Sequence, residues 1–198
     1  MTISAAKVGP GALVLIVGPS GAGKDTLIRL AGARLRNEDG IRFARRIVTR
    51  QADTDAEDHD TLDDAAFTDL VAGGRAALHW RAHGLGYALP AEIDDWIAKG
   101  GTVVANVSRR VIADAAAKYA RLAVVHVTAP APVLRARLLE RSRDDGSDIE
   151  ERLAPVPIEV PVGIDLHEIV NDDTPEAGGR HMAGIIAGCS GSGLAATG

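Results

Sequence analysis

The stretch ALVLIVGPSGAGKDTLIR, residues 12–29, decides the fold. Its first six residues form the continuous apolar run that is typical of a parallel strand buried on both faces. Leu27, Ile28 and Leu30 then begin the apolar stripe of a helix. The segment between them, residues 18–24, reads GPSGAGK and matches the phosphate-binding pattern G-x-x-x-x-G-K.

Strand, loop, lysine and helix therefore follow one another in the order that a phosphate site requires. The glycines let the loop turn its backbone N–H groups inward, and the helix adds its positive N-terminal end, so that Lys24 completes an anion cradle. The alternative is a tight turn with a surface lysine. We predict nucleotide phosphate binding by Gly18, Pro19, Ser20, Gly21, Ala22, Gly23, Lys24, Asp25 and Thr26.

One position departs from the phosphate-binding pattern. Ser or Thr is expected after the lysine, because its hydroxyl binds Mg²⁺, but this chain has Asp25 there. A carboxylate is also a hard oxygen ligand for Mg²⁺, directly or through water. We therefore predict Asp25 as the metal residue.

Composition predicts one globular α/β domain, residues 1–187, followed by a disordered tail of small residues, 188–198. The formal charge of −5 argues against a nucleic-acid surface or a polybasic membrane patch. A lone Cys189 excludes an internal disulfide, and no apolar run approaches the length of about 20 residues that a membrane span needs. We expect a cytoplasmic protein with small-molecule partners, and the sequence leaves a homodimer open.

Strands and helices alternate along the chain, which predicts three layers around a parallel β-sheet core. The core would comprise residues 12–36 and 102–187. Between them, residues 41–99 would form a small insertion that binds the acceptor. The insertion would start with a strand over 41–48 and include two extended pieces around a turn at 84–86.

Arginines cluster near residue 140. Arg137 and Arg141 are four residues apart and share a helix face, just before the flexible sequence DDGS at 144–147. Phosphoryl transfer is catalysed largely by positioning and by cations, and a closing segment also excludes water. We predict a helical lid at about 137–153, with Lys24, Arg137 and Arg141 as catalytic residues; salt bridges to nearby glutamates are the alternative.

Five segments occur in the order found in guanylate-kinase-like proteins: GPSGAGKDTL (18–27), TR (49–50), GLGY (84–87), RLLERSRDD (137–145) and IVNDD (169–173). Within that group, GKD at 23–25 and WRAHGLGY at 80–87 make the chain most similar to the ribose 1,5-bisphosphate phosphokinases. The resemblance implies a P-loop NTPase-type fold that uses ATP and Mg²⁺, and places Asn171 on the adenine side. It also implies phosphorylation of ribose 1,5-bisphosphate to 5-phosphoribosyl 1-diphosphate during phosphonate breakdown.

The acceptor can be tested against guanylate kinase itself, because a guanine reader needs carboxylates that accept hydrogen bonds from the base. In an ungapped comparison through Tyr87, the family's guanine-reading Glu falls at Arg81, and its later aspartates fall at Asn106 and Ser108. A cation and neutral groups suit a second phosphate and sugar hydroxyls instead. The predicted acceptor residues are Arg46, Arg50, Arg81, His83, Tyr87 and Asn106.

The sequence leaves two alternatives open. Guanylate kinase, or a kinase for another phosphorylated metabolite, is the runner-up. A non-catalytic guanylate-kinase-like binding module is less favoured, because the loop lysine and the lid arginines are both kept.

Overall fold

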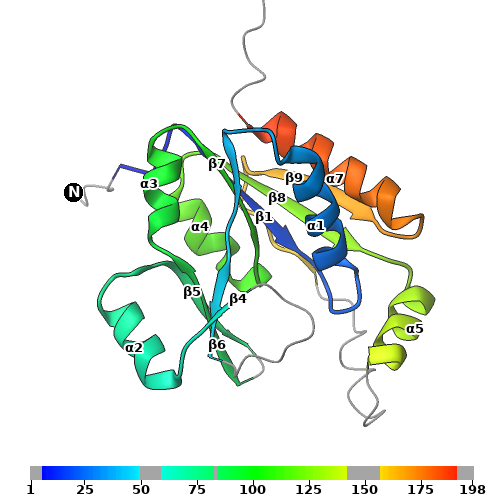
Figure 1. Cartoon of the computed structure of the whole chain (residues 1–198), viewed down its shortest axis with the longest axis horizontal. Helices are drawn as coiled ribbons and strands as arrows, with labels where there is room; N and C mark the ends of the chain where they lie inside the picture. Colours follow the sequence, from blue (N-terminus) through cyan, green and yellow to red (C-terminus); the bar gives the residue numbers. More distant parts are fainter. Residues whose placement is uncertain (1–5, 50–58, 83, 142–156, 191–198) are drawn as a thin grey trace, which may run out of the picture.

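A computed structural model describes residues 6–49, 59–82, 84–141 and 157–190 of the chain. Its middle layer is a five-stranded parallel sheet in the order β2-β7-β1-β8-β9 (Figure 1). The strands are β1 (Ala12–Val17), β2 (Ile41–Phe43), β7 (Thr102–Asn106), β8 (Leu122–Thr128) and β9 (Asp165–Val170). All six residues of β1 are buried, which confirms the interpretation of its apolar run as a central strand.

Helices cover both faces of this sheet. On one face α1 (Lys24–Leu35) packs beside α7 (Pro175–Cys189), and their apolar residues share a core with Val14, Ile16 and Val125. On the other face lie α3 (Glu92–Ala98) and α4 (Ile112–Lys118), the latter preceded by the short helix η1 (Arg109–Val111). The predicted three-layer α/β architecture is therefore confirmed (Figure 1).

The predicted insertion contains a second, smaller sheet in the order β4-β3-β6-β5. Its strands are β3 (Arg46–Val48), β4 (His59–Thr61), β5 (Ala76–Ala82) and β6 (Leu85–Pro90), and α2 (Asp64–Ala72) covers it. The strands β5 and β6 pair antiparallel on either side of the expected turn. Phe67 of α2 packs against Ile47 and Ala88 of this sheet.

The prediction of a single strand over 41–48 was wrong. Residues 41–43 pair in parallel with β7 of the large sheet, whereas residues 46–48 pair antiparallel with β6 of the small one. Ala44 and Arg45 belong to neither strand, and the N–H of Ala44 still donates to the Val104 carbonyl (2.8 Å). One extended run thus supplies a strand to each of two sheets, because its two ends meet different partners (Figure 1).

Two predicted segments differ at their ends. The helix expected to begin the lid, α5 (Ala131–Arg141), is present, but residues 142–153 of the expected lid lie outside the described residues. The disordered tail was predicted to begin at residue 188, but α7 runs to Cys189, and the Ser190 hydroxyl donates to the Ala187 carbonyl (2.7 Å).

Across the part of the chain that the structure describes, every helix is too short or too polar to traverse a lipid bilayer.

Candidate active site

The loop between β1 and α1 has the backbone of a phosphate cradle. Gly23 begins the helix with φ of 87°, a left-handed conformation that favours glycine. A side chain on Gly18 would collide with the Val127 carbonyl, and one on Gly23 would collide with Asn171. No side chain caps the first turn of α1, so its N–H groups are left for an anion.

Lys24 lies across this loop. Its Nζ donates to the carbonyls of Gly18 (2.8 Å) and Pro19 (2.9 Å). The ammonium group is therefore held beside the turn that the glycines create. A cation in this position favours the binding of a polyphosphate at the start of the helix.

Two side chains from the last third of the sequence donate hydrogen bonds to carbonyls of the loop. Asn171 follows β9 and is 6% exposed, and its Nδ2 donates to the carbonyl of Ala22 (2.8 Å). Arg137 of α5 spans the same place, with Nη1 donating to the Gly21 carbonyl and Nη2 to the Asn171 carbonyl, both at 3.4 Å. The predicted adenine-side and lid residues thus meet at the phosphate loop.

Asp25 and Asn106 form a pair beside the cradle. Asp25 lies in the first turn of α1, and Asn106 ends β7, the strand adjacent to β1. Asn106 Nδ2 donates to Asp25 Oδ1 (2.7 Å), which is the length of a charge-assisted hydrogen bond. The bond fixes one oxygen of the carboxylate and leaves the other for a ligand.

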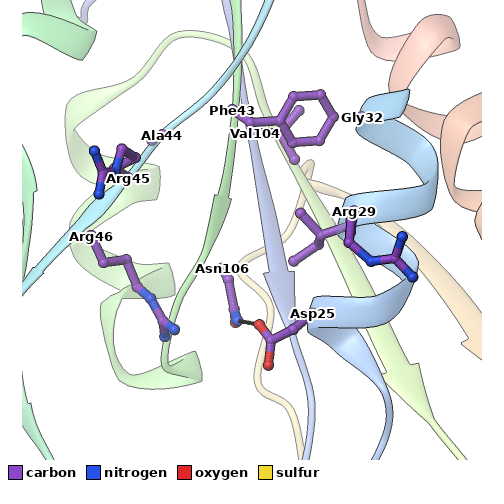
Figure 2. Close-up of a pocket in the computed structure, with 10 residues that line it drawn as sticks. Asp25, Arg29, Gly32, Phe43, Ala44, Arg45, Arg46, Val104 and Asn106 are labelled. Carbon is purple, nitrogen blue, oxygen red and sulfur yellow. Dashed lines mark hydrogen bonds between the residues drawn. The ribbon is translucent and has the colours of Figure 1, made fainter. Parts of the chain in front are cut away.

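A cavity of about 470 Å³ opens next to this pair. It is lined by Asp25, Ile28, Arg29, Gly32, Phe43, Ala44, Arg45, Arg46, Val104 and Asn106. Figure 2 shows the Arg46 side chain reaching from β3 toward Asn106 and Asp25, whereas Arg29 and Arg45 point away from them. Arg45 instead pairs with Asp60 of β4 (3.4 Å). The cavity therefore offers a cation from the small sheet and an amide from the large one.

Two aromatic rings lie next to Arg46, on the small-sheet side of the cavity. The Arg46 guanidinium lies 6.0 Å from the centre of the Tyr87 ring, and Tyr87 stacks on Trp80 with ring centres 5.4 Å apart. Trp80 is 7% exposed and belongs to the core beneath the small sheet. Packing of the rings thus limits where the Arg46 side chain can lie.

His126 has a shifted proton affinity near the loop. It lies on β8 opposite Val17, the last residue before the phosphate loop. Burial lowers the pKa of His126, Glu168 acts in the opposite direction, and the charge of Lys24 lowers it further. The 3.6 Å contact with Glu168 would be an ion pair only if the histidine were protonated. Burial is the largest influence, so we take His126 as neutral at pH 7.

Comparison with known proteins identifies the family of the chain. A family model described as an AAA domain matches residues 14–154. A protein from Methylobacterium radiotolerans named ribose 1,5-bisphosphate phosphokinase PhnN is 48% identical over 178 residues, which are 90% of this chain and 99% of that one. A protein of the same name from Rhodopseudomonas palustris is 53% identical over 146 residues, which are 74% of this chain and 75% of that one. This chain belongs to the ribose 1,5-bisphosphate phosphokinase family.

The fold has a wider relationship. The crystal structure of guanylate kinase from Anaplasma phagocytophilum superposes with a TM-score of 0.65 at 18% identity, covering 95% of this chain and 93% of that one. This likeness concerns the fold alone. Membership of a P-loop kinase family implies that the chain binds ATP and acts on a small-molecule substrate.

The structure brings some of the predicted site residues of this family member together and leaves others apart. Arg46, Asp25 and Asn106 line one cavity, and Tyr87 lies against Arg46. Arg81 does not line that cavity: its Nη1 lies 3.2 Å from Asp64 Oδ1, and its guanidinium faces Phe67. Strand alternation explains this placement, because Trp80 and Arg81 point to opposite faces of β5.

Other predicted residues lie at the limits of what the structure describes. Arg50 and His83 are outside the described residues, and so is the side chain of Arg141, whose backbone ends α5. Ser20 is exposed at the tip of the phosphate loop. Sequence reasoning missed Arg29, which also lines the cavity. Its spacing of four residues from Asp25 on α1 was the available signal.

Proposed function

We propose that this chain transfers the γ-phosphoryl group of ATP to the 1-phosphate of ribose 1,5-bisphosphate during phosphonate breakdown. The names of the relatives support this activity, and the protein from Methylobacterium radiotolerans is similar over 90% of this chain and 99% of its own length. An oxygen of the 1-phosphate would attack the γ-phosphorus, and the bond from that phosphorus to the ADP oxygen would break. The products are 5-phosphoribosyl 1-diphosphate and ADP. The attacking oxygen is already ionised near neutral pH, so the reaction needs no general base.

The cavity beside the phosphate loop is the observation that supports ribose 1,5-bisphosphate over a guanine nucleotide as the acceptor. Among the described residues that line it, Asp25 is the one carboxylate, and Asn106 already donates to that carboxylate. A guanine base would require free carboxylates to accept its N–H groups. Arg46 and the amide of Asn106 are better suited to a phosphate and to sugar hydroxyls.

For ATP, we assign the phosphates to the loop of residues 18–26, with Lys24 as the cation nearest the transferred group. Arg137 lies against the same loop and would stabilise negative charge that develops on the phosphoryl oxygens. Arg141 is proposed for the same role from its position four residues later on the helix.

Mg²⁺ suits the donor set at this position. The described residues contain no cluster of three or more acidic, histidine or cysteine side chains, which is consistent with an ion that is bound mainly through substrate phosphates and water. Asp25 would supply one carboxylate oxygen, and Asn106 would hold that carboxylate in place. When bound, Mg²⁺ would neutralise charge on the β- and γ-phosphates.

For the sugar, we assign a phosphate to Arg46 and the neighbouring wall to Tyr87, with Asn106 bordering the same cavity. Arg50 and His83 are proposed from the resemblance of their segments to the family. Arg81 receives no acceptor contact in this proposal, because its guanidinium is paired with Asp64 on the opposite face of the small sheet.

An acceptor screen tests the proposal. Purified protein would be given ATP and Mg²⁺ with ribose 1,5-bisphosphate, GMP, ribose 5-phosphate or no acceptor, and ADP release would be followed. We expect turnover with ribose 1,5-bisphosphate, formation of 5-phosphoribosyl 1-diphosphate, and no turnover by Lys24→Ala. Efficient turnover of GMP alone would favour a guanylate kinase instead.

The same screen addresses the remaining alternatives. Tight ATP binding without turnover of any acceptor would indicate a binding module.

We also propose a cytoplasmic enzyme without a nucleic-acid partner, which the formal charge of −5 supports. A homodimer remains open, and light scattering of the purified chain would measure it.

A further inference from the structure

The side chain of Asn171 is buried at the junction of three parts of the fold. Its backbone N–H donates to the Thr128 carbonyl at the end of β8 (2.7 Å), which fixes the residue next to the phosphate loop. Its Nδ2 donates to the Ala22 carbonyl (2.8 Å), 149 positions away in the sequence. The side chain therefore links the last strand of the sheet to the middle of the loop.

The phosphate loop needs such a donor. A loop that turns its N–H groups inward to an anion must turn carbonyls outward, and a buried carbonyl without a partner is costly. Ala22 is fully buried, so a protein donor must satisfy its carbonyl. Asn171 supplies that donor from a side chain that is itself 6% exposed.

Both ends of the Asn171 amide lie close to the protein backbone. A side chain on Gly23 would collide with Nδ2, and a Cβ on Gly178 of α7 would lie 3.4 Å from Oδ1. The amide thus lies between the loop and α7, and because the residue is 6% exposed it presents little surface to an adenine ring.

We propose that Asn171 is a positioning residue for the phosphate loop and does not read the adenine base. It acts through the Ala22 carbonyl, which sets the direction of the peptide groups that hold the polyphosphate of the nucleotide. The inference rests on the proposed nucleotide site, and it is independent of the acceptor.

The test compares ATP with inorganic tripolyphosphate, which has the phosphates without the nucleoside. Affinities would be measured by calorimetry with EDTA present, so that metal binding at Asp25 does not contribute. Asn171→Leu keeps the approximate shape and removes the donor. We expect it to weaken both ligands about tenfold, because the loop loses the donor that orients its peptide groups toward the phosphates. The ratio of the two affinities should stay within about twofold of wild type.

Asp172→Asn is the matched control. Asp172 is exposed in the same turn, so this variant should keep both wild-type affinities. Weaker ATP binding with unchanged tripolyphosphate binding in Asn171→Leu would assign the residue to the nucleoside and overturn the proposal. Unchanged binding of both ligands would also overturn it. Asn171→Ser, a smaller change, serves the same comparison if the leucine variant does not fold.

A measurement on the wild-type protein does not depend on any variant. The side-chain amide resonances of Asn171 in ¹⁵N-labelled protein should shift equally with ATP and with tripolyphosphate. A shift with ATP alone would contradict the proposal. Neither experiment uses a sugar, so a negative acceptor screen would leave both outcomes readable.

Discussion

Removing the amide of Asn106 should loosen the carboxylate that we assign to Mg²⁺. In Asn106→Ala, Asp25 loses the 2.7 Å hydrogen bond that orients it. Hydrogen bonds to charged groups contribute about 1.5–3 kcal/mol, and the lower value applies here because both side chains are only partly buried. A loss of about 1.4 kcal/mol corresponds to a factor of ten. We therefore expect the Mg²⁺ concentration for half-maximal turnover to rise about tenfold.

Two readouts separate this effect from general damage to the enzyme. Turnover would be titrated with Mg²⁺ at fixed ATP, and Mn²⁺ binding to the complex with ADP would be followed by electron paramagnetic resonance, without catalysis. Arg109→Ala is the matched control, because Arg109 is exposed three residues beyond Asn106 and makes none of the described contacts of the site. It should leave both titrations unchanged.

A double-mutant cycle tests whether Asn106 acts through Asp25. Asp25→Asn should weaken metal binding more than Asn106→Ala does, and adding Asn106→Ala to Asp25→Asn should change little. Fully additive losses would show that Asn106 acts independently of Asp25. A shift of less than about twofold in both metal titrations of Asn106→Ala would refute the orienting role.

Three further predictions concern the acceptor, pH and stability. Arg46→Ala should raise the acceptor KM at least about tenfold, since charge-assisted bonds are strong, whereas Arg81→Ala should change it less than about twofold; steady-state kinetics that reverse this order would contradict the assignment. Burial lowers the pKa of His126 in the folded protein below its ordinary value of 6.5. As pH falls, His126 is therefore protonated in the unfolded chain at a higher pH than in the folded one. Stability should therefore fall as pH drops below about 6.5, and urea unfolding of His126→Asn should show a shallower fall. Asp94→Ala leaves the buried Tyr119 hydroxyl without its 2.6 Å partner and should cost about 2 kcal/mol, measured by urea unfolding.

The sequence was sufficient for the central strand and the cradle. A continuous apolar run of six residues predicted β1, and every residue of that strand is buried as expected. The pattern of glycines and Lys24 predicted the loop, because the geometry of an anion cradle is local to a few consecutive residues. Local signals of this kind do not depend on where the rest of the chain goes.

The differences between prediction and structure concern choices that depend on distant partners. Residues 41–48 have the composition of one strand, but nothing in them indicates that the two halves pair in different sheets. Arg81 was assigned to the acceptor by alignment through Tyr87. Which face of β5 a residue occupies depends on register against β6, and here Arg81 pairs with Gly86 on the side that faces α2.

Contacts at the site explain why its residues lie so far apart in the sequence. Asn106 is 81 positions from Asp25, and Asn171 is 149 positions from Ala22. All four residues lie at the carboxyl end of a parallel strand or in the segment that follows it, and such ends meet at one edge of the sheet. A side chain at this edge either contacts a ligand or supports a residue that contacts one, and the sequence does not distinguish these two roles. The amides of Asn106 and Asn171 both donate hydrogen bonds to protein atoms, which favours the supporting role for each.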